Sequence, residues 1–273
     1  MISACMRAAA IGCALLTWSS AGAQDQLALA QPSVETRSAV AADAREVPFG
    51  VGERSTFEVR FGGVRVGSGM LEVAARTTLR GRDAWHTRFN VTGGTFFYRV
   101  DDVYESWIDA VTLNSLAFNR QIEEGTRERI QKYEIMPDNG TYIERTRQKT
   151  TVKKTVDDPM DEGAFLYFIR TIPLEVGKTY DFHRYFIPDR NPVRIRVLRK
   201  ERVTVPAGTF NAIVIQPVIK TRGIFSEKGQ AEVWLSDDPT RILLQVKSKL
   251  SFGSLNLYLK SYTPPTGQRT SRN

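Results

Sequence analysis

Polar and apolar residues alternate along the stretch 205–262, which has the clearest period in the chain. Between Ile242 and Leu250, apolar side chains fall on one side, while glutamine and lysine side chains fall on the other. A period of two residues is typical of a half-buried antiparallel strand. Similar runs precede a turn at 236–239 and follow a turn at 251–254. The stretch therefore predicts a meander of hairpins that bury one face.

The same period continues upstream, where clusters of glycine, proline, asparagine and aspartate separate the apolar runs. Paired glycines at 62–63 and the sequence Pro-Asp-Asn-Gly at 137–140 predict tight turns. The triplet 67–69 is expected to form a bulge or a tight crossing point. The glycines at 93–94 are expected to end the strand that contains Trp85. Between 114 and 150 the strands are unusually polar, so we expect them to be wet on at least one face.

One segment has a helical period. Asp161 can cap a helix in which large apolar residues recur at helical spacing, and Pro173 is expected to end it. The apolar stripe of this segment is wide, so we expect the helix to be buried between parts of the sheet.

These elements predict an all-β fold with one buried helix. About a dozen antiparallel strands would form a meander that curls into a barrel or an open half-barrel, because a flat sheet of this width would leave its edges exposed. A barrel of more than eight strands can enclose something other than its own side chains. The helix would then either fill that space or gate it.

The first residues have the features of an export signal. Arg7 precedes a short apolar run, and small residues at 21–23 offer a cleavage site. We expect a signal peptide at 1–23, a flexible leader at 24–46, a single β-barrel-like domain at 47–263 and a flexible tail at 264–273. Both cysteines lie inside the signal, and no later stretch has the roughly 20 apolar residues of a membrane helix. These features predict a periplasmic protein without disulfides.

The formal net charge of the chain is +8. An exported protein meets no genomic DNA, so the expected anionic partners are lipid or another anionic envelope component rather than nucleic acid. A basic row on one face of the strand predicted at 193–205 could contact a phosphate-bearing surface, although a solvated sheet face would look the same. The row comprises Arg194, Arg196, Lys200 and Arg202. The oligomeric state is not predicted.

Candidate chemistry is sparse. The chain has only two histidines and no spacing typical of a metal site, so no metal, cofactor or catalytic residue is predicted. Asp181 and His183 would share a face of a strand and could orient a base, but a half-exposed histidine is the simpler interpretation. The acidic pairs at 101–102 and 237–238 are typical of calcium or glycosidase sites, and also of hydrogen-bonded turns.

The predicted helix supplies the candidate ligand-binding residues. Its apolar side chains would line a lipid-binding groove or, alternatively, pack into the core. These residues are Phe165, Leu166, Phe168 and Ile169.

Several stretches resemble a known family. They are PFGVGERSTFEVRFGGVRVGSGMLEV, DDVYESWID, AGTFNAIVIQ and KGQAEVWLSDDPTRILLQVKSKLSFGSLNLYL. Together they resemble the exported bacterial proteins grouped as domain of unknown function 3108, and the likeness spans residues 47–262. The family has no assigned catalytic residues. Its architecture implies similarity to periplasmic antiparallel half-barrels, including lipoprotein carriers that enclose an apolar groove.

We therefore expect a non-enzymatic periplasmic protein that binds an apolar or lipid ligand or acts as an interaction module of the cell envelope. The alternative is a hydrolase acting on envelope glycan or lipid. A carrier needs an internal apolar surface, whereas a hydrolase needs a cleft in which His183 or Asp102 converges with other polar groups. A purely structural binding module would have a filled interior and an exposed apolar or basic patch.

Overall fold

The computed structural model describes residues 46–95, 98–220, 231–250 and 253–266. The predicted signal peptide lies outside the described residues, as does all but the last residue of the predicted leader. In the described part of the chain, no helix is both long enough and apolar enough to cross a membrane.

The described chain is an all-β structure with one short α-helix. Its single sheet contains 14 strands, and all their pairings are antiparallel. The strands are β1 (Arg54–Phe61), β2 (Val64–Leu79), β3 (Arg82–Thr95), β4 (Tyr98–Asp109), β5 (Ser115–Glu124), β6 (Arg127–Met136), β7 (Thr141–Thr146), β8 (Thr150–Lys154), β9 (Thr179–Phe182), β10 (Val193–Val205), β11 (Gly208–Val218), β12 (Glu232–Ser236), β13 (Leu243–Leu250) and β14 (Gly253–Thr263). The helix is α1 (Glu162–Phe168), and two short 3₁₀ turns are η1 (Pro137–Asn139) and η2 (Pro188–Arg190). The predicted fold class is confirmed.

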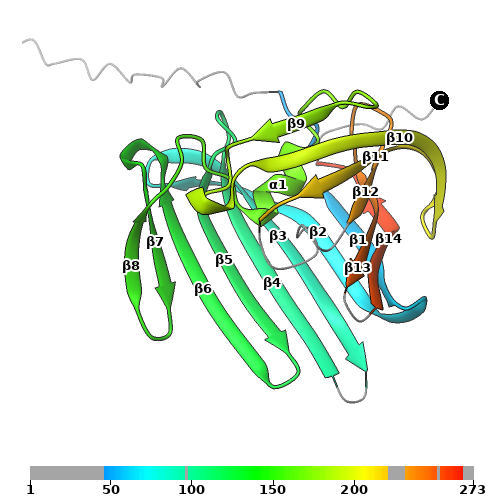
Figure 1. Ribbon diagram of the computed structural model, residues 1–273, viewed down its shortest axis with the longest axis horizontal. Coiled ribbons are helices and arrows are strands. Elements are labelled where there is room, and N and C mark those ends of the chain that lie inside the picture. Colours follow the sequence, from blue (N-terminus) through cyan, green and yellow to red (C-terminus); the bar gives the residue numbers. More distant parts are fainter. Residues whose placement is uncertain (1–45, 96–97, 221–230, 251–252, 267–273) are drawn as a thin grey trace, which may run out of the picture. The chain divides into compact units, whose positions relative to one another are not determined.

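The sheet is an open meander. Its order is β8-β7-β6-β5-β4-β3-β2-β1-β14-β13-β12-β11-β10-β9, so the first and last strands pair in its interior. The two edge strands, β8 and β9, are consecutive along the chain and do not pair with each other. The segment between them contains α1, and the sheet curls around this helix (Figure 1). Of the two shapes expected from the sequence, the open one is therefore observed.

Bulges and glycines allow the sheet to curl. Register shifts interrupt six of the pairings, and a bulge bends its strand and increases the local twist. Gly67 of β2 lies opposite Gly93 of β3. A Cβ atom on Gly67 would lie 2.2 Å from the carbonyl oxygen of Thr92, so only glycine fits. The tight crossing predicted at 67–69 is confirmed. The predicted break at 93–94 is wrong, because β3 continues to Thr95 through this close contact.

The helix begins as predicted and ends early. Asp161 is its N-cap, and one carboxylate oxygen accepts hydrogen bonds from the N–H groups of Gly163 and Ala164. Burial raises the pKa of Asp161 to about 6, although Ser106 and the helix N–H groups favour the charged form. The helix ends at Phe168 rather than at Pro173, because tighter turn-type hydrogen bonds to the carbonyls of Tyr167 and Phe168 replace the α-helical pattern.

The two ends of α1 are fastened to different parts of the sheet. At its start, Ser106 of β4 donates a hydrogen bond of 2.6 Å to Asp161, and the N–H of Asp161 donates to Ser115 of β5. Just after its end, Arg170 forms an ion pair of 2.6 Å with Glu53, which directly precedes β1. The helix was expected either to fill the space inside the curled sheet or to gate it, and these contacts support the filling role.

Candidate functional site

We define the inner face as the side of the sheet that α1 covers. Side chains alternate between the two faces along each strand, so the inner face of β5 carries Phe118, Arg120 and Ile122. The register places Gln131 opposite Arg120, and Lys153 opposite Tyr142. Polar residues from several strands therefore meet on one face.

These residues form a polar cluster with groups from α1 and from the segment after β9. The cluster consists of Arg120, Gln131, Tyr133, Glu144, Lys153, Glu162, Tyr185 and Arg190.

Glu144 is the acceptor at the centre of one half of the polar cluster. Its Oε1 accepts hydrogen bonds from Gln131 at 3.0 Å and from the hydroxyl of Tyr133 at 3.2 Å, and its Oε2 accepts one from Lys153 at 3.0 Å. Burial alone would raise the pKa of Glu144, but the bond from Lys153 and the other donors lower it. Burial raises the pKa of Tyr133, so this tyrosine stays a neutral donor. This half of the cluster is internally satisfied.

Arg120 and Glu162 occupy the other half, which is less complete. Arg120 donates from Nε to Gln131 at 2.8 Å, and its Nη1 lies 3.6 Å from Oε1 of Glu162. The hydroxyl of Tyr185 donates to the same oxygen at 2.5 Å and accepts from Arg190 at 3.2 Å. Oε2 of Glu162 is buried and has no hydrogen-bond partner among the described residues. The charged side chains of Arg120 and Glu162 thus lie at the inner face without using all their hydrogen-bonding atoms.

Beside the polar cluster the inner face carries mainly apolar side chains, which surround the buried Asp102 opposite Val91 and Ile122. Tyr104 of β4 lies opposite Arg120, and Phe89 of β3 lies opposite Tyr104, with ring centroids 6.1 Å apart. We name the inner apolar surface as the partly exposed residues Phe89, Val91, Tyr104 and Ile122. On the far side of β2 the inner face continues with buried residues of β1, β14 and β13 such as Leu257 and Val246.

The predicted ligand-binding residues of the helix lie in the core. Phe165, Leu166, Phe168 and Ile169 have exposed fractions of 1%, 7%, 4% and 0%. This burial agrees with the core-packing alternative, and ligand contact by these four residues stays a prediction. Phe168 packs edge-on against Phe182, with ring centroids 5.0 Å apart.

The predicted basic row is not on one face, and this prediction is wrong. Leu198 is an extra residue in β10, because Val197 pairs with Ile215 and Arg199 pairs with Val214. An extra residue exchanges the two faces of a strand beyond it. Arg194 and Arg196 therefore face away from Lys200 and Arg202.

Two members of the row also form ion pairs within the protein. Arg194 forms two hydrogen bonds of 2.7 Å with Asp181, and Lys200 lies 2.9 Å from Asp237. Contact of the row with an anionic surface stays a prediction.

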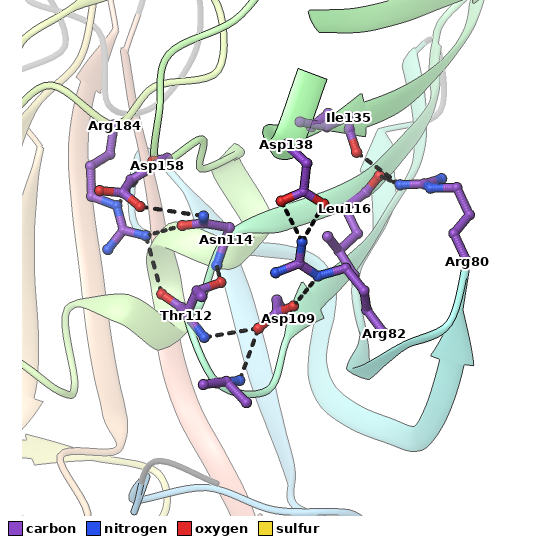
Figure 2. Close-up of polar contacts among 11 residues, drawn as sticks. Arg80, Arg82, Asp109, Thr112, Asn114, Leu116, Ile135, Asp138, Asp158 and Arg184 are labelled. Carbon is purple, nitrogen blue, oxygen red and sulfur yellow. Dashed lines mark hydrogen bonds and ion pairs between the residues drawn. The ribbon is translucent and has the colours of Figure 1, made fainter. Parts of the chain in front are cut away.

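Three hairpin ends meet at the rim near α1, as Figure 2 shows. Arg82 lies between Asp109 and Asp138, with an ion pair of 2.7 Å to each. Arg80 donates to the carbonyls of Leu116 and Ile135. Burial alone would raise the pKa of Asp109, but hydrogen bonds from the Thr112 N–H and from Arg82 lower it. The network fastens the ends of the β2–β3, β4–β5 and β6–β7 hairpins to one another.

The same rim carries a surface cleft of about 430 Å³, lined by Val156, Asp157, Asp158, His183 and Arg184. Asn114 donates to Asp158 and accepts from Arg184, so it holds the wall of the cleft in place (Figure 2). The structure brings His183 together with Asp157 and Asp158. Asp181 binds Arg194 instead, and Asp102 is not part of the cleft.

The remaining candidates have structural partners. His86 stacks on Trp107 with ring centroids 4.5 Å apart. Asp102 accepts a hydrogen bond from the N–H of Glu123, and Asp238 accepts from the N–H groups of Thr240 and Arg241, as expected for a turn. Within the described ranges, no group of three histidine, cysteine or acidic residues could hold a metal ion.

Sequence reasoning missed most of the polar cluster. The polar character of the middle strands was the available signal, but it did not separate the two faces. Arg120 and Lys153 lie on the inner face, whereas Arg145 pairs with Glu134 on the other. The position of Glu162 relative to the strands could not be predicted, because its helix lies on the segment that connects the two edge strands of the sheet.

The fold and the site define an open antiparallel β-sheet that is wrapped around a short helix, with a polar cluster on its inner face. The chain belongs to the family described as "Protein of unknown function (DUF3108)", which matches residues 56–260. No curated protein matches the sequence.

Solved structures include a similar fold. A "beta-barrel-like protein of domain of unknown function DUF1849" from Brucella abortus is 10% identical, with a TM-score of 0.50, over 80% of this chain and 99% of that chain. A "putative lipoprotein" from Parabacteroides distasonis is 12% identical, with a TM-score of 0.37, over 80% of this chain and 98% of that one. A "putative exported protein with YmcC-like fold" from Bacteroides fragilis is 12% identical, with a TM-score of 0.29 and the same two coverages.

Proposed function

We propose that this protein is a non-enzymatic, periplasmic component of the cell envelope that binds an apolar or lipid ligand on the inner face of its sheet. The ligand would lie on the inner apolar surface, on the part of the strands that extends past α1. The observation that carries the proposal is that the strands extend well past the short helix that covers them.

With seven residues, α1 is about 10 Å long, because an α-helix rises about 1.5 Å per residue. With 14 residues, β3 is about 48 Å long at about 3.4 Å per residue. The helix is fastened near the start of β3 and the end of β4, and both strands extend well past it (Figure 1). The partly exposed side chains of Phe89, Val91 and Ile122 lie on the extended part.

An apolar surface of this kind suits an acyl chain, because transfer of each CH₂ group from water contributes roughly 0.8 kcal/mol. An extended chain of about a dozen carbons would gain enough to bind without a deep pocket. The family match is compatible with this role but names no ligand.

The proposal is tested with delipidated full-length protein and dodecanoate, by isothermal titration calorimetry below the micelle threshold. Saturable binding is expected, and Val91→Asn should weaken it about tenfold, which corresponds to roughly 1.4 kcal/mol. Val152→Asn is the matched control, because Val152 is 65% exposed on the other face of β8. Absence of saturable binding, or equal effects of the two variants, would contradict the proposal.

A second candidate, the hydrolase, is favoured only by the rim cleft. His183, Asp157 and Asp158 line this cleft together, and such groups could move a proton. Release of sugars or fatty acids from envelope fractions by wild-type protein, but not by His183→Ala, would support it.

A further inference from the structure

Arg120 differs from Lys153, another cation of the polar cluster, in its contact with carboxylates. Its side chain is only 16% exposed, yet its nearest carboxylate oxygen, on Glu162, lies 3.6 Å away. A guanidinium has five N–H donors, and within the described part of the protein one of them, on Nε, makes a hydrogen bond. By contrast, Lys153 forms an ion pair of 3.0 Å with Glu144.

The carboxylate nearest to Arg120 is already used by another donor. Oε1 of Glu162 accepts a short hydrogen bond from Tyr185, whose hydroxyl is also bonded to Arg190. Burial opposes the charge of Arg120, but nearby Glu162 raises its pKa, so the guanidinium stays charged. The Nη donors of Arg120 therefore remain available for an anion.

The charges around Arg120 do not exclude an anion. On the inner face of strands β4 to β8 and on the segments packed against them, the described cations include Arg120, Arg129, Lys153, Arg184 and Arg190. The described acids there include Asp102, Glu144, Asp161 and Glu162. Of these acids, Glu144 is neutralised by Lys153, and Asp102 accepts from a backbone N–H.

We propose that Arg120 binds the anionic head group of an acyl-chain amphiphile whose chain lies on the inner apolar surface. This inference rests on the proposed function and names the ligand class for it. Tyr104 lies directly opposite Arg120, and Ile122 is the next residue of β5 on the same face. A head group at Arg120 would thus continue into a chain lying over Tyr104, Ile122 and Val91.

A carboxylate or phosphate monoester matches the guanidinium, because both accept two parallel hydrogen bonds. Because of such charge-assisted bonds, a charged head group typically binds about 10- to 100-fold more tightly than a neutral one.

The test compares dodecanoate, dodecyl phosphate, dodecanol and inorganic phosphate, each titrated into delipidated full-length protein at pH 7.5. Wild-type protein should bind both anionic amphiphiles about 10- to 100-fold more tightly than dodecanol, and inorganic phosphate should not compete. Arg120→Gln should remove this difference without changing dodecanol binding. Arg120→Lys should keep part of it, because a lysine retains the charge but not the paired donors.

The matched control is Arg88→Gln. Arg88 lies on the other face of β3, where it pairs with Glu105 at 3.0 Å, so its loss should leave every affinity unchanged. Circular dichroism of each variant checks folding.

Equal wild-type affinities for dodecanoate and dodecanol would overturn the role of Arg120 in binding the head group while leaving the proposed function intact. Weakening of dodecanol and dodecanoate to the same extent by Arg120→Gln would assign Arg120 a purely structural role and also overturn it. Competition by inorganic phosphate would identify a site for free anions instead. Failure of every amphiphile to bind would overturn both proposals.

Discussion

Replacing Arg170 by methionine should destabilise the protein strongly. The Arg170 and Glu53 side chains are 2% and 6% exposed, and they share hydrogen bonds of 2.6 and 3.2 Å. Arg170 also donates to the carbonyls of Pro48 and Thr240, so the guanidinium joins α1 to the chain before β1 and to the turn after β12. Methionine would keep the volume of the side chain but none of these bonds.

The size of the destabilisation follows from the unpaired Glu53 carboxylate that the substitution leaves buried. Removing one partner of a buried ion pair costs about 3–5 kcal/mol, because the other charge remains buried without compensation. For a domain of this size, each kcal/mol corresponds to about 2–4 °C in Tm, so a fall of roughly 10 °C is expected. Urea unfolding followed by tryptophan fluorescence would measure the change in free energy of unfolding.

The effect should depend on pH. Burial raises the pKa of Glu53 above its ordinary value, and Arg170 opposes this rise. Without Arg170, the pKa of Glu53 in the folded state rises further. A carboxyl group whose pKa is higher in the folded than in the unfolded state destabilises the folded protein more and more as the pH increases above the unfolded pKa. Arg170→Met should therefore be less destabilising at pH 5 than at pH 8.

The control is Arg145→Met, which removes an exposed ion pair with Glu134 and should cost about 0–1 kcal/mol. A loss below about 1 kcal/mol for Arg170→Met at pH 8, or a larger loss in acid, would refute the reasoning.

Two further predictions concern the backbone and the basic row. Gly67→Ala should cost about 1–3 kcal/mol in urea unfolding, because its Cβ would lie 2.2 Å from a carbonyl oxygen, whereas Gly69→Ala has 3.5 Å to its nearest neighbour and should cost less; equal losses would contradict this. In sedimentation with vesicles containing anionic phospholipid, either Arg196→Glu or Arg202→Glu should weaken binding, but not both, because the two side chains face opposite ways. Equal weakening of vesicle binding by both substitutions would argue against the placement of Arg196 and Arg202 on opposite faces.

Most of the strands could be predicted from the sequence because they have a local period of two residues, whereas the short, polar and mostly exposed β8 was not predicted. The start of α1 could also be predicted, because the cap at Asp161 is a local interaction between a side chain and the next backbone N–H groups. The alternation in β10 was read correctly up to Val197. Beyond it, the extra residue Leu198 exchanged the faces, and no composition signal marks such a bulge.

The candidate site was harder to predict because its parts come from distant segments. Arg120 and Gln131 are neighbours through one hairpin, but Glu162 and Tyr185 reach them only through the segment that crosses between the sheet edges. Polarity of the middle strands was visible in the sequence. Which face it occupies depends on register, and register depends on the whole sheet.

The pairing of β1 with β14 has a consequence for how the chain acquires its structure. Phe57 lies opposite Leu259, so β1 must wait for a pairing strand that is synthesised about 200 residues later. Until then, β1 presents an unpaired backbone edge to other chains, and contacts between residues so far apart slow folding. A nascent chain would thus benefit from a chaperone that shields this edge until the last hairpin emerges.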